Sequence, residues 1–183
     1  MNKYLKWTLI SIGSVIVLLV AWVLIFGKSY TKSFSPQEVA TYEQGGTKIT
    51  VAYSRPFKKD RVVFGGLVPY GEVWRTGANE ATVFSTNVPL TIDGESLPPG
   101  DYTLFTIPDV DTWQVIFNSK AYSWGLNFDG TSPREAEFDV LTTTVPVRSL
   151  AEVTEQFTIA ISNEGGLNLA WDQTAVSVPL GGL

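Results

Sequence analysis

Residues 102–118, which read YTLFTIPDVDTWQVIFN, decide the fold class that this sequence predicts. Tyr102–Ile107 and Trp113–Asn118 each alternate between two kinds of side chain, as a half-buried strand does. The five residues Pro108–Thr112 that join them have a length typical of hairpin loops. We therefore predict an antiparallel hairpin at this point in the chain.

Segments with the same character flank this hairpin on both sides. Turn signals separate them at Asp93-Gly94, at Pro98-Pro99-Gly100 and at Asn163–Gly166. About nine short strands recurring with such turns are the signature of an antiparallel β-sandwich, jelly-roll-like or barrel-like. The further predicted strands are Lys48–Tyr53, Ala81–Ser85, Val88–Ile92, Glu137–Val145, Glu155–Ile161, Leu167–Trp171 and Val176–Leu180, with Val62–Phe64 as a shorter candidate.

The sequence divides into four parts: a tail at 1–7, an apolar segment at 8–26, a linker at 27–46 and a β domain at 47–183. Within the linker, Ser35-Pro36-Gln37-Glu38 resembles a helix capping box, which predicts a short helix reaching Tyr42. A further helix, of one turn only, is predicted at Ser149–Val153.

Thr8–Phe26 carries no charge and, as a helix, would be about 28 Å long, close to the thickness of a bilayer core. A cleaved signal peptide is the alternative, but it has a shorter apolar run and a small-residue cleavage site. We therefore expect an uncleaved single-pass anchor. Two lysines lie on each side of it, and the short N-terminal tail favours a C-terminal domain that faces the periplasm or exterior.

Composition limits the chemistry that this chain can perform. From Ser33 onward nine Lys and Arg face eighteen Asp and Glu, so this part carries a net charge of −9, which disfavours nucleic acid as a partner. The sequence has no Cys, which removes thiolate nucleophiles and Cys-ligated metal centres, and no His, which removes the commonest general base and the commonest metal ligand. Asp109, Asp111 and Asp129 are interpreted as turn residues rather than calcium ligands. No metal and no cofactor is predicted.

The stretch Tyr53–Thr82 is the most promising place for a binding site, because it mixes glycine, proline, aromatic and charged residues most densely. Its glycines are expected to serve tight loops rather than a phosphate cradle. The residues that we predict to bind a ligand are Arg55, Tyr70, Trp74, Arg75, Asn79 and Glu80, together with Trp124 from a later loop. We predict no catalytic residue.

Each of these residues also has a purely structural interpretation. Arg55 and Arg75 suit carboxylates, phosphates or sugar hydroxyls, but they can also form internal ion pairs with Glu72 or Glu80, or hydrogen bonds to loop carbonyls. Asn79 and Glu80 can simply tie the loop to neighbouring backbone. Tyr70, Trp74, Trp113 and Trp124 can form an aromatic platform for sugars or peptides, or they can fill the core.

Several of these motifs resemble a bacterial envelope family known as domain of unknown function 2911. They are Tyr53–Pro56, Phe64–Gly71 and Val73–Thr82, followed by Leu97–Tyr102, Leu104–Pro108 and Trp124-Gly125. The resemblance covers roughly Lys48–Leu180 and implies a secreted or membrane-attached β-rich domain with no assigned activity. In that family an arginine often follows an Asp-Val-Leu step, whereas here Thr142 follows Asp139–Leu141.

Three functions are compatible with these observations. The first is a non-catalytic domain, anchored in the membrane by residues 8–26, that binds a small molecule, a glycan or a protein through the central loop. The second is a structural envelope scaffold, which would have no concave pocket near Arg75. The third is a hydrolase of envelope glycans that uses Glu72 and Glu80, which would need the two carboxyl groups about 5–10 Å apart. We expect the first.

Overall fold

The computed structural model describes residues 2–182, without the side chains of residues 23–30, and it divides into two units, 1–34 and 35–183. In the first unit α1 runs over Lys3–Phe34. Its part Lys3–Trp22 is long and apolar enough to cross a membrane, a property that a membrane anchor shares with a signal sequence. Residues 3–7, predicted as a tail, are helical.

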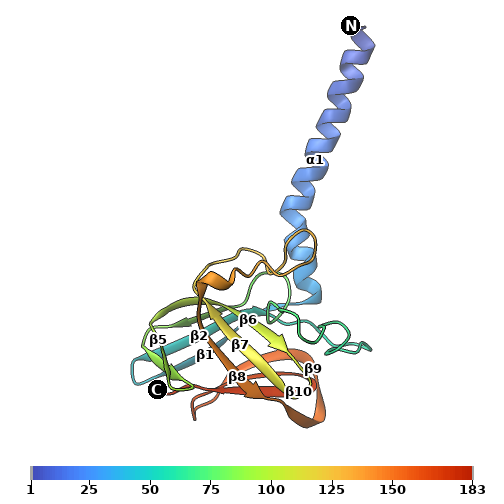
Figure 1. The fold of residues 1–183 in the computed structure, drawn as a ribbon. Coiled ribbons are helices and arrows are strands. Elements are labelled where there is room, and N and C mark those ends of the chain that lie inside the picture. Colours follow the sequence, from blue (N-terminus) through green and yellow to red (C-terminus); the bar gives the residue numbers. More distant parts are fainter. Residues whose placement is uncertain (1, 183) are drawn as a thin grey trace. The chain divides into compact units, whose positions relative to one another are not determined.

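The second unit is built from ten strands (Figure 1). Six form one antiparallel sheet in the order β1-β2-β3-β6-β7-β8, while β9 pairs with β10 and β4 pairs with β5. The strands are β1 Gln37–Gln44, β2 Thr47–Ser54, β3 Val83–Thr86, β4 Leu90–Ile92, β5 Glu95–Leu97, β6 Gly100–Pro108, β7 Thr112–Asn118, β8 Asp139–Pro146, β9 Arg148–Ile161 and β10 Gly166–Pro179. A 3-10 turn, Ala136–Phe138, precedes β8.

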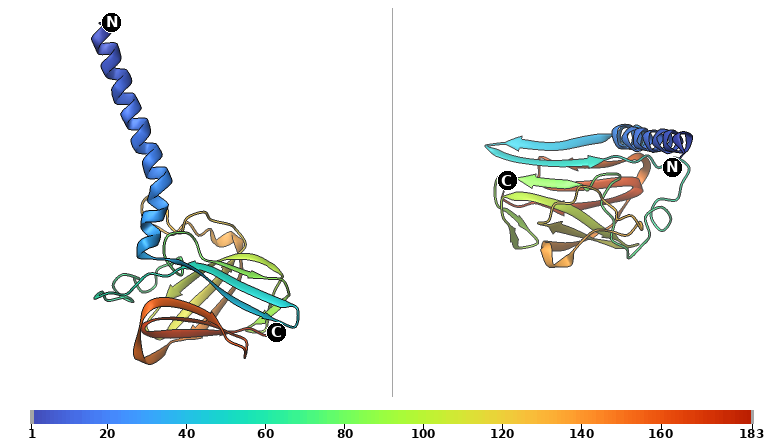
Figure 2. Two further views of the ribbon diagram at one scale, coloured as in Figure 1. Left: turned by 180° about the vertical axis from the view of Figure 1, so that it is seen from behind. Right: turned by 90° about the horizontal axis from the view of Figure 1, so that it is seen from above.

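The long β9–β10 ribbon lies across one face of the six-stranded sheet (Figure 2). The core between them combines alternate residues of the sheet, such as Val51, Leu104 and Phe117, with Ile159 and Leu169 of the ribbon. This sandwich-like arrangement of antiparallel strands confirms the predicted fold class. It forms because the strands carry apolar residues that must be buried against another element.

The central hairpin is confirmed as β6 and β7, with Thr103 opposite Asn118 and Pro108 opposite Trp113. β6 and β7 bury residues on both faces of the sheet. Phe105 and Ile116 are buried on the face away from β9–β10. There the Phe105 ring meets the Tyr122 ring edge-on, with the ring centroids 5.5 Å apart. β6 and β7 are thus buried on both faces rather than half-buried as predicted, because this second face is also covered.

Two predicted helices are wrong. Gln37–Gln44 forms β1, which pairs with β2 through the two-residue turn Gly45-Gly46, whose φ angles of 61° and 87° suit a tight hairpin. Ser149–Val153 belongs to β9, where Ser149 pairs with Thr174. In both places, pairing with a neighbouring strand outweighs the local helix signal. Val62–Phe64 is not a strand either, and only Phe64 makes a bridge, to Val68.

Candidate functional site

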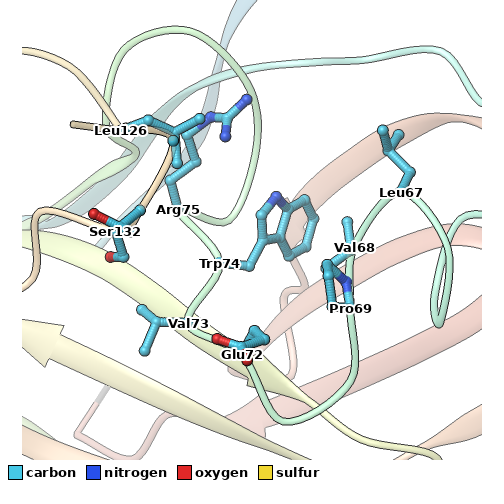
Figure 3. Close-up of a pocket in the computed structure, with 11 residues that line it drawn as sticks. Leu67, Val68, Pro69, Glu72, Val73, Trp74, Arg75, Leu126 and Ser132 are labelled. Atoms are coloured by element: carbon cyan, nitrogen blue, oxygen red, sulfur yellow. The ribbon is translucent and has the colours of Figure 1, made fainter. Parts of the chain in front are cut away.

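A pocket of about 530 Å3 lies beside the central stretch (Figure 3). Two segments that are distant in sequence form its walls, residues 67–75 and residues 126–132. A volume of this size suits a small molecule. The lining residues are mostly apolar on the first wall and, apart from Leu126, small or polar on the second: Leu67, Val68, Pro69, Glu72, Val73, Trp74 and Arg75, then Leu126, Gly130, Thr131 and Ser132.

Backbone hydrogen bonds hold the first wall in place. The amide of Gly65 donates to the carbonyl of Val68 at 2.9 Å, and the amide of Gly71 donates to the carbonyl of Pro108 at 2.9 Å. Trp74 and Thr106 exchange both of their backbone hydrogen bonds, at 2.7 and 2.9 Å. The loop is thus fastened to β6 immediately before Arg75. Because these glycine amides already have acceptors, the glycines serve the loop geometry.

The Trp74 side chain belongs to the core rather than to an exposed aromatic platform. Its ring stacks on that of Trp171, with the ring centroids 5.9 Å apart. It meets the rings of Phe157 and Trp113 edge-on, with centroid distances of 5.0 and 6.1 Å. Its Nε1 donates to the carbonyl of Gly77 at 3.1 Å, and only 8% of the residue is exposed. Trp74 therefore gives the pocket one rigid apolar wall and holds the backbone that leads to Arg75.

Within the described part of the chain, Arg75 has neither of the internal ion pairs that its structural interpretation allows. Among residues 2–182, no hydrogen bond and no ion pair joins Arg75 to Glu72 or Glu80. The Nε atom of Arg75 is buried and has no hydrogen-bond acceptor. Burial lowers the pKa of the Arg75 guanidinium below its ordinary value. The aliphatic part packs so closely on Gly125 that a Cβ there would lie 2.1 Å from Arg75 Cδ. The guanidinium is therefore a partly desolvated cation held in one place.

The backbone after Arg75 is strained. Thr76 is fully buried with φ at 55°, a conformation that is unusual for a β-branched residue. Its hydroxyl donates to Thr106 Oγ1 at 3.1 Å, and its carbonyl accepts from Thr82 Oγ1 at 2.8 Å. Asn79 also has a positive φ, of 59°. Such strain persists only where the surroundings hold it, and it is concentrated at functional sites.

The second wall is a loop that stabilises itself by hydrogen bonds. The amide of Asn127 donates to the carbonyl of Thr131 at 2.9 Å, and the amide of Gly130 donates to the carbonyl of Asn127 at 3.0 Å. Asp129 Oδ1 accepts from the amide and the hydroxyl of Thr131, and these bonds lower the pKa of Asp129. Asp129 thus acts as a turn residue, and Gly130 and Thr131 are presented to the pocket in a fixed position.

Two predicted site residues are used to hold the fold. Arg55 donates from Nε to the carbonyl of Phe157 at 3.0 Å and from Nη2 to Thr158 Oγ1 at 2.8 Å, and it forms an ion pair with Glu38. Asn79 Nδ2 donates to the backbone carbonyl of Ser35 at 3.3 Å, and the backbone carbonyl of Asn79 accepts from the amide of Gly125 at 3.0 Å. Arg55, directly after β2, is thus joined to β9, and Asn79 joins the central loop to the start of the domain and to Gly125, which immediately precedes the 126–132 wall.

Of the remaining predicted residues, none is among the described residues that line the pocket. Tyr70 and Trp124 are exposed at 43% and 36%, and the Tyr70 ring lies over Gly65. Glu80 is half-buried, whereas Glu72, considered only for the hydrolase, does line the pocket. The structure therefore brings Trp74, Arg75 and Glu72 together and places the others elsewhere.

Sequence reasoning missed the whole second wall. The sequence pattern assigns Trp124 to the site and predicts Asp129 as a turn residue, but it gives no role to Leu126, Gly130, Thr131 or Ser132. The turn residues Asn127, Asp129 and Gly130 indicate a tight turn without indicating where it folds back. The one available signal was Gly125, whose lack of a side chain allows Arg75 to approach.

Comparison with known proteins shows which family this chain matches. The profile of the family described as "Protein of unknown function (DUF2911)" matches residues 35–180. Curated proteins and solved structures gave no significant match. The matched range includes β1, both walls of the pocket and the final strand, so the pocket lies entirely within the family domain. Within residues 2–182 no group of three or more potential metal-ligating side chains occurs.

Proposed function

The chain belongs to the DUF2911 family, and we propose that its β unit is a non-catalytic ligand-binding domain whose site is the pocket beside Arg75. The ligand has a carboxylate or phosphate for Arg75 and an apolar body for Val68, Val73 and Trp74. The second part of the proposal is that α1 remains attached as a membrane anchor, with the domain outside the cytoplasm.

The observation that carries the binding proposal is the Arg75 guanidinium without a counter-ion. Burying a charge is costly unless it is paired, and buried polar atoms in folded proteins nearly always have partners. An anionic ligand would supply the missing acceptor, and a planar guanidinium suits a carboxylate or phosphate well. The strained Thr76 and the close contact with Gly125 support a site in which the surroundings fix this cation in position for a ligand.

A concave pocket next to Arg75 favours binding over a scaffold, for which no such pocket was expected. The hydrolase has less support. It requires two carboxyl groups facing one cleft, and Glu80 is not among the described residues of the pocket that contains Glu72. The chain also has no His or Cys to assist in another type of hydrolysis.

The binding proposal is tested by thermal unfolding of the full-length chain in phospholipid nanodiscs, with inorganic phosphate, short-chain carboxylates, peptides and glycans as probes. We expect at least one anionic probe to raise Tm for the native chain and for Arg148→Ala, which removes an exposed arginine on β9. The same probe should have no effect on Arg75→Ala. A shift that survives in Arg75→Ala, or no shift with any anionic probe, would contradict the proposal.

The anchor is tested in cells that make the full chain. Mass spectrometry of the membrane fraction should recover an intact N-terminal peptide that includes Lys3, because no cleavage has occurred. Protease added to intact spheroplasts should degrade residues 35–183 while a cytoplasmic control protein survives. A soluble product that begins after residue 26 would identify a cleaved signal sequence instead.

A further inference from the structure

Glu72 lines the same pocket as Arg75 but is not paired with it. The two residues are three positions apart in sequence and have opposite charges, so an ion pair between them would have been the simplest arrangement. None of the described ion pairs involves either residue, and the Glu72 side chain is exposed. The pocket therefore holds one cation and one anion that do not neutralise each other.

The directions of the side chains explain why they remain apart. Figure 3 shows the Arg75 guanidinium directed away from Glu72, with the Trp74 side chain lying between the two charged groups and Val73 beside Glu72. The apolar wall thus lies between the charges and not to one side of both. Since three residues of extended chain reach at most about 11 Å, the Cα atoms of Glu72 and Arg75 are no farther apart than this.

We infer that the ligand of this pocket is a short peptide of about two to four residues with a free carboxylate and a free ammonium group. This inference depends on the proposed function, because it assigns the carboxylate to Arg75. The ammonium group is placed at Glu72, and an apolar side chain lies against Val73 and Trp74. A pocket of about 530 Å3 has room for such a molecule.

The order of the groups favours a peptide over a zwitterionic lipid. In a lipid the two headgroup charges are adjacent and the apolar chains extend to one side of both. In a peptide with free ends, the apolar side chains lie between the two charges, as the apolar wall does here.

The net charge of the domain also favours a peptide. A net charge of −9 from Ser33 onward repels a purely anionic ligand, whereas a ligand without net charge feels no such repulsion.

The test is calorimetric titration of the full-length chain in nanodiscs with the tripeptide Ala-Leu-Ala, its N-acetyl derivative and its C-terminal amide. The variants are Glu72→Gln and Arg75→Gln, with Glu152→Gln as a control that removes an exposed acid of β9. We expect acetylation and Glu72→Gln each to weaken binding by about three- to fivefold, as for an exposed ion pair. The acetylated peptide should bind the native chain and Glu72→Gln equally well. Amidation and Arg75→Gln should each weaken binding more than tenfold.

The possible results separate this inference from the proposed function. If acetylation and Glu72→Gln have no effect while amidation and Arg75→Gln do, the pocket binds carboxylates and the peptide inference is wrong. If Ala-Leu-Ala does not bind at millimolar concentration, the peptide inference is also overturned, and the phosphate and carboxylate probes decide the proposed function alone. If Arg75→Gln binds every probe as the native chain does, both fail. Comparison of the free and acetylated peptides needs no variant, so a misfolded Glu72→Gln would not prevent a decision.

Discussion

At the scale of single residues, Arg75 depends on the absence of a side chain at Gly125. A Cβ at position 125 would lie 2.1 Å from Arg75 Cδ and 2.9 Å from its Cβ and Cγ. These atoms belong to the base and middle of the arginine side chain, so they cannot move aside without displacing the guanidinium. Gly125 and Arg75 therefore act as a pair, although fifty positions separate them.

We predict that Gly125→Ala lowers the free energy of unfolding by about 1–3 kcal/mol, the usual cost of overpacking, and weakens binding of anionic probes. In the Arg75→Ala background the same substitution should cost less, because two of the three close contacts are gone. Urea unfolding of the four proteins in this cycle measures the coupling. Equal costs in both backgrounds would show that the close approach to Arg75 has no energetic importance.

Tyr53 gives a prediction about pH. Burial raises the pKa of its phenol above 10.0, and the Oη donates to the carbonyl of Ile159 at 3.2 Å and accepts from the amide of Ile159 at 2.9 Å. In the unfolded chain the phenol ionises at about pH 10. Between the unfolded and the folded pKa, the folded state binds more protons, so its stability falls as pH rises through this window.

We therefore predict that the free energy of unfolding decreases above about pH 10, and that it decreases less steeply in Tyr53→Phe. At pH 7 the variant should be less stable by about 1–2 kcal/mol, because it loses both hydrogen bonds to Ile159. Urea unfolding between pH 7 and pH 11 measures both effects. Burial also raises the pKa of Tyr102, which remains in the variant, so the slope should become smaller rather than vanish.

At the scale of elements, two glycines in turns have different functions. Gly94 follows Asp93 in the turn between β4 and β5, with φ at 81° and open space around it. Gly77 lies in the loop after Arg75, with φ at 152°, and a Cβ there would lie 2.9 Å from the carbonyl oxygen of Ser54. The first is needed only for its backbone conformation, and the second is needed also because β2 approaches so closely.

We predict that Gly94→Ala costs about 1 kcal/mol of stability, since only the backbone conformation is penalised. Gly77→Ala should cost more than about 2 kcal/mol, because the new methyl group also displaces the β2 backbone. Thermal unfolding of the two variants under the same conditions compares them directly. If Gly94→Ala proved the more destabilising, the close packing of the loop on Ser54 would be wrong.

At the scale of the whole molecule, the β unit begins earlier than residue 47. β1 forms one edge of the large sheet, buries Tyr42 and, through Glu38, pairs with Arg55 of the central stretch. The family match also begins at residue 35. Residues 35–46, predicted as part of a linker, thus contribute a strand to the sandwich.

We predict that a fragment of residues 35–183 unfolds cooperatively as a monomer, because the core cluster lies wholly within it. A fragment of residues 47–183 should be less stable by several kcal/mol, or should aggregate, because the edge of β2 is then uncovered. Calorimetry and size-exclusion chromatography of both fragments measure this difference. Equal melting temperatures would show that β1 is dispensable.

The sequence by itself determined the fold class, the central hairpin, the apolar N-terminal helix and the family. The first three follow from periodicity, turn residues and segment length, which act over a few neighbouring positions, whereas the family follows from the resemblance of its motifs. Two of the residues that it predicted to bind a ligand, Trp74 and Arg75, line the pocket. Pairing between strands decided β1 and Ser149–Val153, because a short segment with a mixed pattern adopts whichever structure its neighbours complete.

The tertiary structure alone decided how the site is composed. It joined the 126–132 loop to the 67–75 loop, used Arg55 and Asn79 to fasten the fold, and left Arg75 without a counter-ion. The physical reason is that an arginine pairs with whichever acceptor lies within about 3 Å in space, and such a distance between remote segments leaves no trace in local sequence. Chemistry within a few residues was thus predictable, and chemistry across loops was not.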